Sequence, residues 1–151
     1  MATFPYYSWH HGVVVPKKHP LTRKAALALD DLADFPIITY QPGFTGRARI
    51  DEAFEKAGLA PRIAMTALDA DVLKTYVEIG LGIGIIASMA FSKEHDPTLA
   101  LLGASHLFAK CTSLIAIRRG AYLRRYACRF IELCAPSLSE ATIRQAGGTA
   151  E

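Results

Sequence analysis

The chain has 151 residues, of which 51% are hydrophobic and 21% charged, and its formal net charge is +3 at pH 7. This size and composition are typical of one globular domain with its own core, and so small a positive charge does not imply a nucleic-acid partner. No apolar run is long enough to span a membrane, and residues 1–12 lack a signal-peptide pattern. Cys111, Cys128 and Cys134 lack metal-ligand spacing and are typical of reduced thiols, so we expect a cytoplasmic protein.

Predicted strands and helices alternate along the chain. Short apolar or β-branched runs predict strands at residues 10–16, 36–40, 62–67, 83–88 and 112–120. Apolar residues at helical spacing predict helices at 27–35, from Thr45 to Gly58, at 72–82 after a cap at Asp69 or Asp71, and at 122–135. This alternation predicts an α/β domain with a mainly parallel sheet and flanking helices. Beyond Pro136 we expect weak helix and a disordered end.

Thr45 and Gly46 follow the predicted strand 36–40 and stand at the start of a predicted helix. Ligands of parallel sheets bind at the carboxyl ends of strands, often against helix N-termini, where unpaired N–H groups favour negative charge. Gly46 allows a ligand to approach the backbone closely, and the Thr45 hydroxyl adds a donor. The segment therefore predicts a site for an anion or carboxylate. The alternative is that Thr45 is only a helix N-cap worth about 1 kcal/mol.

Other candidate motifs do not form a catalytic or metal site. The glycines of residues 80–84 have the wrong spacing for a dinucleotide loop and run from helix into strand. His10 and His11 are adjacent, so in a strand they point to opposite faces, and we interpret them as ordinary surface or core histidines. The arginine-rich segment 118–129 is interpreted as a solvated helix face, with a phosphate-binding patch as the alternative. We predict no enzyme activity, no catalytic residues, no metal and no cofactor.

Four segments occur together in one known family: Tyr7–Trp9, GFTGR at 43–47, IDEAFEKAGL at 50–59 and DADVLKTYV at 69–77. They resemble the effector-binding domain of LysR-type transcriptional regulators, and most closely the CysB-like branch, which governs sulfur assimilation and cysteine biosynthesis. The similarity extends from about Phe4 to Leu138. It implies that this chain is the effector-sensing portion of such a regulator; the alternative is a stand-alone solute-binding protein of the same fold.

The resemblance also implies a domain organisation. The family's effector domain is similar to type II periplasmic binding proteins, with two α/β subdomains and a ligand cleft between them. Residues 1–111 would form subdomain two with its hinge strand, residues 112–138 a strand and helix that return to subdomain one, and residues 139–151 a tail. The helix-turn-helix domain and the early half of subdomain one have no counterpart here, so we expect DNA contacts only through an absent N-terminal domain.

The same resemblance assigns roles to individual residues. In the CysB-like branch the cleft accepts sulfate or a small acylated serine, such as O-acetylserine or N-acetylserine. Thr45 matches a threonine that contacts the anion, and Trp9 matches a tryptophan at the cleft. Gly46 and Arg47 would supply backbone donors beside Thr45. Pro42 and Leu68 depart from the family pattern, which leaves the identity of the effector open.

The helix predicted at 122–135 has a strongly apolar face that should pack on subdomain one. Its members are Leu123, Tyr126, Ala127, Phe130, Ile131 and Cys134. Because most of that subdomain is missing here, we expect the face to be exposed. We therefore expect the chain to form homo-oligomers, by exchanging this strand and helix between copies.

Overall fold

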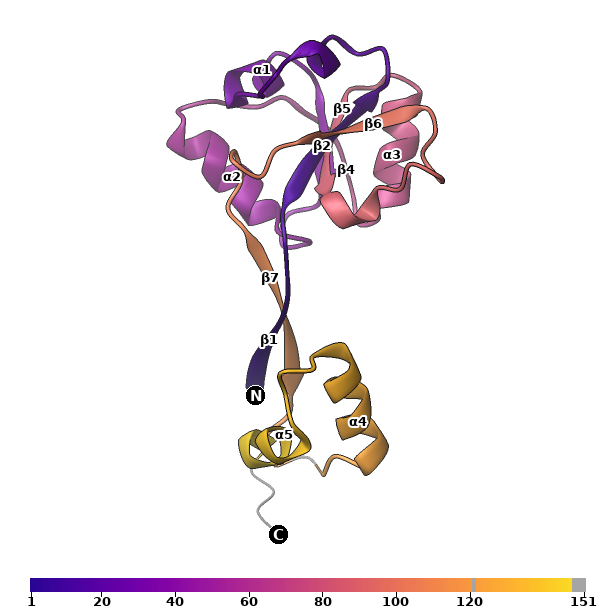
Figure 1. The fold of residues 1–151 in the computed structure, drawn as a ribbon. Coiled ribbons are helices and arrows are strands. Elements are labelled where there is room, and N and C mark those ends of the chain that lie inside the picture. Colours follow the sequence, from indigo (N-terminus) through magenta and orange to yellow (C-terminus); the bar gives the residue numbers. More distant parts are fainter. Residues whose placement is uncertain (121, 148–151) are drawn as a thin grey trace. The chain divides into compact units, whose positions relative to one another are not determined.

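The computed structural model describes residues 1–120 and 122–147, which form two compact units. The larger unit is Trp9–Cys111, and the smaller unit combines Met1–Ser8 with the chain from Thr112 onward. The chain passes between the two units along the strands β1 (Ala2–Trp9) and β7 (Cys111–Ile117), as Figure 1 shows.

The larger unit is built on a five-stranded sheet with the order β4-β3-β5-β2-β6 (Figure 1). Its strands are β2 (His11–Pro16), β3 (Ile37–Tyr40), β4 (Ile63–Ala67), β5 (Ile83–Ala87) and β6 (Leu99–Gly103). Strand β3 pairs in parallel with β4 and β5, whereas β2 is antiparallel to β5 and β6. Four strands therefore run in one direction, as expected for a mainly parallel sheet, and β2 runs against them.

Helices cover both faces of this sheet (Figure 1). On one face, α1 (Leu29–Ala33) and α2 (Arg47–Lys56) pack against Val13 and Val15 of β2. On the other face, α3 (Ala70–Glu78) packs through Leu73 and Val77. Successive side chains of a strand point to opposite faces of the sheet, which explains this division. Val14 packs in the core on the α3 face, whereas Val13 and Val15 pack in the core on the face covered by α1 and α2. Two short 3₁₀ helices, Pro20–Arg23 and Ser88–Ala90, complete the unit.

The structure differs from the sequence-based expectation by two additional strands and in the bounds of several elements: α3 ends at Glu78 rather than 82, α4 (Arg125–Cys134) begins at Arg125 rather than 122, and β7 ends at Ile117 rather than 120. Strands β1 and β6 were not predicted. Strand β1 contains Pro5, which is tolerated in a strand with a free edge, and the apolar run of β6 has no strand-specific periodicity. Helix α2 begins at Arg47 rather than at Thr45, because Thr45 and Gly46 have φ angles of 39° and 69°. Those angles are incompatible with a right-handed helix.

The smaller unit pairs β1 with β7 and carries α4 (Arg125–Cys134) and α5 (Glu140–Gly147). Ile117, Cys128 and Ile143 form its core. The tail expected to be weakly helical thus forms helix α5, and the expected disordered end falls on residues 148–151, outside the described residues. No described helix combines the length and the apolar composition that crossing a bilayer requires.

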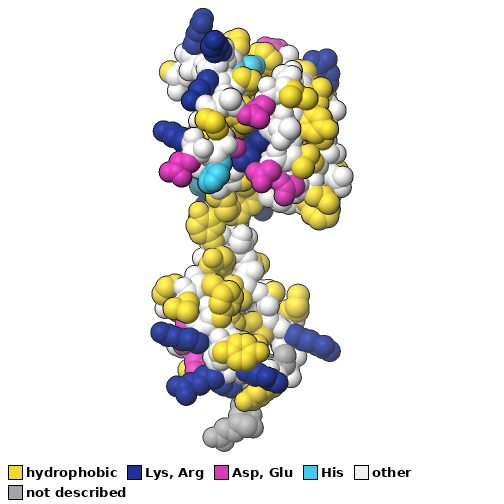
Figure 2. Space-filling model, turned by 90° about the vertical axis from the view of Figure 1, so that its right-hand side faces the viewer, with side chains coloured by type: hydrophobic (Ala, Val, Ile, Leu, Met, Phe, Trp, Pro, Cys, Tyr) yellow, Lys and Arg dark blue, Asp and Glu magenta, His cyan; other side chains and the backbone are white. Residues whose placement is uncertain are grey.

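The apolar face predicted for residues 122–135 is only partly covered within the smaller unit. Leu123 and Ile131 pack against its core, whereas Tyr126 and Phe130 are 71% and 67% exposed. They line an apolar groove of about 660 Å³ between α4 and β7. Figure 2 shows hydrophobic side chains gathered on the surface of this unit. The exposure of this face agrees with the sequence-based expectation.

Candidate functional site

The segments that follow β3, β4 and β5 lie at the same edge of the sheet, because these three strands are parallel. Strand β2 runs the other way and therefore begins at this edge, where His11 pairs with Ala87, the last residue of β5. Trp9 and His11 are thus placed beside the segment that follows β3. This is the edge at which ligands of open α/β sheets bind.

The connection from β3 to α2, residues 41–46, has an unusual backbone, and we name it the Thr45 turn. Thr45 is the only non-glycine residue with positive φ in the described part of the chain, and its side chain is exposed. Gly46, not Thr45, is the N-cap of α2, and no side chain caps the helix. The interpretation of Thr45 as an N-cap is therefore wrong. A left-handed non-glycine residue costs about 1–3 kcal/mol, and such residues cluster at functional sites.

The Thr45 turn leaves several backbone donors unused. The Arg47 N–H donates to the Phe44 carbonyl at 2.8 Å, so it is not available in the way the sequence suggested. The Arg49 N–H donates to the Gly46 carbonyl, also at 2.8 Å. Among the described residues, the N–H groups of Thr45, Gly46 and Ala48 have no hydrogen-bond acceptor. The start of α2 therefore offers donors to an outside partner.

Charge at the start of α2 also favours an anion. The first turn of the helix contains no acidic residue, so nothing opposes the positive end of its dipole. Arg49 adds a half-exposed guanidinium group, which is paired with Glu52 Oε2 at 3.2 Å. This group acts on Cys111 behind the turn: burial raises the pKa of the Cys111 thiol, and the charge of Arg49 works against that rise.

The Arg47 side chain holds the turn rather than facing solvent. It is buried, with 8% of its surface exposed. Its Nη1 donates to the carbonyl of Tyr40, the last residue of β3, at 2.6 Å, and its Nε donates to Asp51 Oδ1 at 2.7 Å. These contacts tie the first turn of α2 to the end of the strand that precedes it.

Three side chains from distant parts of the sequence form the wall behind Gly46. A Cβ atom at Gly46 would lie 2.8 Å from Cys111 Sγ, 2.9 Å from His11 Cε1 and 3.1 Å from Trp9 Cη2. Trp9 is 8% exposed and packs with Ala87 and Cys111. The structure thus brings Trp9, Gly46 and Thr45 together, and it places the indole behind the turn.

His11 is the member of this group whose role sequence reasoning missed. It is 1% exposed, and its Nε2 lies 3.3 Å from the Thr45 carbonyl oxygen. Its ring lies edge-on to Trp9, with centroids 5.0 Å apart, and edge-on to Phe108 at 5.7 Å. The position of His11 on the same strand face as Val13 and Val15 indicated burial, but no sequence signal pointed to its partner.

The family described as LysR substrate binding domain matches residues 1–139. The chain belongs to this family. It is 53% identical over 143 residues to the HTH-type transcriptional regulator SsuR of Burkholderia cenocepacia, covering 95% of this chain and 46% of that protein. It is 47% identical over 146 residues to CysB of the same organism, covering 97% and 47%.

The solved structure of the cofactor-binding domain of the Cbl transcriptional regulator is also similar to this LysR domain. The TM-score is 0.92 at 42% identity, and the match covers 98% of this chain and 65% of that one. The expected family, its CysB-like branch and the fold are therefore confirmed. SsuR and CysB are named as HTH-type transcriptional regulators, and the LysR domain spans about half the length of each.

The LysR domain should lose stability in mild acid because of His11. Burial lowers the pKa of His11, the hydrogen bond to Thr45 partly offsets this effect, and His10 lowers the pKa further. Since the folded-state pKa lies below the unfolded value of about 6.5, the unfolded chain binds the proton first as pH falls. The contribution of neutral His11 to the free energy of unfolding is therefore complete above about pH 6.5 and is lost progressively below that pH.

Urea unfolding at pH 7.5 and pH 5.5 measures this effect, with His11→Gln as the comparison because glutamine does not titrate. His19, whose pKa is also lowered by burial, is present in both proteins and cancels in the difference. We expect a smaller loss of stability between the two pH values in His11→Gln than in the unsubstituted chain. Equal losses would contradict this assignment.

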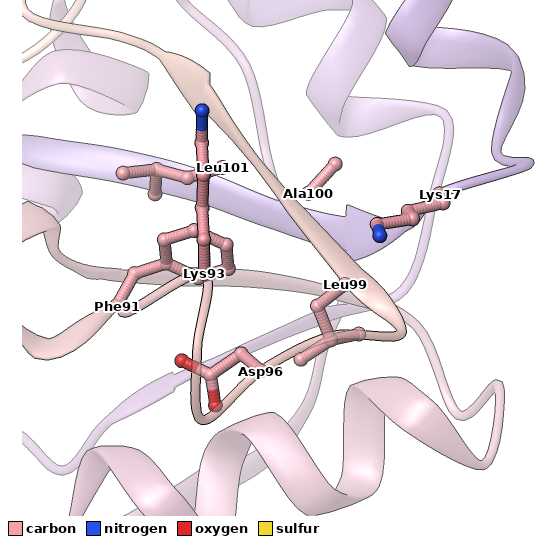
Figure 3. Close-up of a pocket in the computed structure, with 7 residues that line it drawn as sticks. All are labelled: Lys17, Phe91, Lys93, Asp96, Leu99, Ala100 and Leu101. Atoms are coloured by element: carbon pink, nitrogen blue, oxygen red, sulfur yellow. The ribbon is translucent and has the colours of Figure 1, made fainter.

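Two grooves of the larger unit are lined by residues outside the Thr45 turn. Figure 3 shows one of about 640 Å³. It is lined by Lys17, Phe91, Lys93, Asp96, Leu99, Ala100 and Leu101. A second, of about 490 Å³, borders the buried ammonium group of Lys74, which contacts Asp96 Oδ1 at 2.8 Å and Asp71 Oδ1 at 2.9 Å. Because Lys74 and Asp96 satisfy each other, we interpret this cluster as structural.

In the described part of the chain, no group of three or more His, Cys, Asp or Glu side chains is placed to hold a metal ion. The unpaired N–H groups of the Thr45 turn are hydrogen-bond donors, whereas the carboxylate of Asp69, which follows β4 at the same edge, already accepts a hydrogen bond as the N-cap of α3. The features that converge there are the Thr45 hydroxyl, unpaired N–H groups and a helix start without acidic residues. This set of groups is suited to binding an anion.

Proposed function

We propose that this LysR domain senses a small anionic effector for a transcriptional regulator of sulfur assimilation or cysteine biosynthesis. The candidate effectors are sulfate and an acylated serine such as O-acetylserine or N-acetylserine. Its similarity to SsuR, CysB and Cbl supports this assignment and favours a regulator over a stand-alone solute-binding protein. The observation that carries the proposal is the left-handed Thr45 turn, which presents unpaired donors at the start of α2.

Each residue of the site has a distinct role in this proposal. The Thr45 hydroxyl and the N–H groups of Thr45 and Gly46 donate to oxygen atoms of the anion. Gly46 keeps the backbone accessible, since it carries no side chain. Trp9 forms the apolar wall behind the turn, and Arg47 holds the turn against β3 through its side chain. Hydrogen bonds to a charged group contribute about 1.5–3 kcal/mol each, so the loss of one is expected to weaken binding about 10- to 100-fold.

Regulation would follow if the effector bound more tightly to one arrangement of the regulator's subunits than to another. An effector shifts an equilibrium only by the free energy with which it prefers one state. We propose that the regulator is a homo-oligomer in the cytoplasm and that it contacts DNA through an N-terminal helix-turn-helix domain. The names of SsuR and CysB as HTH-type regulators, and their greater length, support this part of the proposal.

The test is calorimetric titration with sulfate, O-acetylserine and N-acetylserine. Thr45→Val removes the hydroxyl but keeps the β-branched shape, and therefore the backbone preference, of threonine. We expect saturable binding of at least one anion and an affinity about 10- to 100-fold lower in Thr45→Val. Thr45→Ser keeps the hydroxyl and should remain close to the unsubstituted chain. Binding of none of the three compounds, or equal affinity in Thr45→Val, would contradict the proposal.

A further inference from the structure

We propose that His11 is a positioning residue for the anion site. Its ring N–H holds the carbonyl group of Thr45 and so keeps the Thr45 turn in its left-handed form. This inference rests on the proposed function of the turn. It concerns a residue that contacts the turn from inside the core and not the anion itself.

The chemistry of the contact fixes the state of the imidazole ring. His11 Nε2 lies 3.3 Å from the Thr45 carbonyl oxygen, and a carbonyl oxygen can only accept a hydrogen bond. The hydrogen must therefore reside on Nε2. Nδ1 is buried and has no hydrogen-bond partner among the described residues, so a second proton would find no acceptor there. The arrangement thus specifies one neutral tautomer.

The ring cannot leave this position easily. His11 is the first residue of β2, where it pairs with Ala87, the last residue of β5. Trp9 and Phe108 contact the ring edge-on at centroid distances of 5.0 and 5.7 Å. The ring centroid of Phe108 lies 6.4 Å from that of Phe54 of α2. The imidazole is therefore held between the sheet and the helix whose start forms the site.

Peptide geometry links this buried contact to the exposed donors. The Thr45 carbonyl and the Gly46 N–H belong to one peptide group, and the described chain contains no cis peptide bond. In a planar trans peptide the C=O and N–H point in opposite directions. Since the carbonyl points inward to His11, the Gly46 N–H points away from His11, toward the side on which an anion is proposed to bind. His11 thus determines the direction of a donor that it does not touch.

Two substitutions separate the hydrogen bond from the packing. His11→Gln keeps an amide N–H that can reach the Thr45 carbonyl, whereas His11→Phe fills the ring space without a donor. We expect His11→Phe to bind the anion about tenfold more weakly, and His11→Gln to remain within about threefold of the unsubstituted chain. A residue that served only packing would show the reverse order, because phenylalanine is the better shape match.

Nuclear magnetic resonance supplies a readout that does not depend on the ligand. Long-range ¹H–¹⁵N correlations should show the hydrogen of His11 on Nε2, and the backbone couplings and shifts of Thr45 should report a left-handed residue. We expect His11→Phe to lose that left-handed signature and His11→Gln to keep it. If no anion binds the unsubstituted chain, the proposed function fails, yet these spectra still test His11.

Two results would overturn the inference. One is an unchanged Thr45 conformation and anion affinity in His11→Phe. The other is a hydrogen on Nδ1 instead of Nε2 in the unsubstituted chain, which requires no variant and so remains decisive if His11→Phe fails to fold.

Discussion

Replacing Gly46 by alanine is expected to lower the free energy of unfolding by about 2–4 kcal/mol. The residue has a φ of 69°, which a side chain disfavours. The added Cβ would also meet Cys111 Sγ at 2.8 Å and His11 Cε1 at 2.9 Å. Both neighbours are buried, so the backbone of the turn must shift to relieve the contact. Urea unfolding of the two proteins measures the difference.

Gly58→Ala is the matched control for this prediction. Gly58 follows the other end of α2 and has the same φ of 69°, but an added Cβ there would meet no atom within 4 Å. We expect it to show only the backbone penalty, about 1–2 kcal/mol. The excess loss in Gly46→Ala then measures the packing of the wall behind the turn. If the two variants are equally destabilised, that wall is not close-packed.

Removing the carboxylate of Asp96 should lower the free energy of unfolding by about 3–5 kcal/mol. Asp96 and Lys74 are both buried, and Lys74 Nζ lies 2.8 Å from Asp96 Oδ1. Burial alone would raise the pKa of Asp96, but hydrogen bonds from Lys74 and from the Ser92 N–H hold it below its usual range. Asp96→Ala would leave the ammonium group of Lys74 buried without its main partner.

Two further variants test whether the uncompensated charge causes the loss. Combining Asp96→Ala with Lys74→Met removes the charge as well, so we expect the double variant to recover part of the stability. Asp71 also contacts Lys74, but its side chain is 86% exposed, and Asp71→Ala should therefore cost less than about 1 kcal/mol. Chemical unfolding at neutral pH gives all three values. A double variant less stable than Asp96→Ala would contradict the argument.

Local sequence patterns predicted the central elements of the fold but not all of its edges. Strands β2, β3, β4 and β5 were expected within a residue or two of their positions. The runs of β2 and β3 ended at proline or glycine, that of β4 alternated, and that of β5 was continuously apolar. The cap of α3 was expected at Asp69 or Asp71, and Asp69 accepts the hydrogen bond, from the Asp71 N–H at 2.6 Å. Edge strand β6 escaped prediction since its composition suits either a strand or a helix.

The candidate site could be located from sequence only in part. Thr45 and Gly46 stood out because they separate a strand from a helix, which is local information. Trp9, His11 and Cys111 lie close to Gly46 because β2 pairs with β5, and no local sequence pattern encodes that pairing. The orientation of the Thr45 turn depends on those contacts.

Arg47 was expected to offer a backbone donor, but its N–H is already bonded to Phe44. Its pairing with Asp51, one helical turn later, was accessible from the spacing of the two residues. That spacing could have indicated a side chain engaged within α2. The hydrogen bond from Arg47 to the Tyr40 carbonyl could not be predicted from the sequence, because it depends on how α2 packs against β3.

Trp9 is the only tryptophan in the sequence, and it lies directly behind the Thr45 turn. Its fluorescence therefore originates from a single place in the molecule, without background from any other indole. An anion that binds at Thr45, or a turn that leaves its left-handed form, would alter the surroundings of this one ring. The protein thus carries an intrinsic optical reporter at its candidate site, and ligands can be screened without attaching a dye.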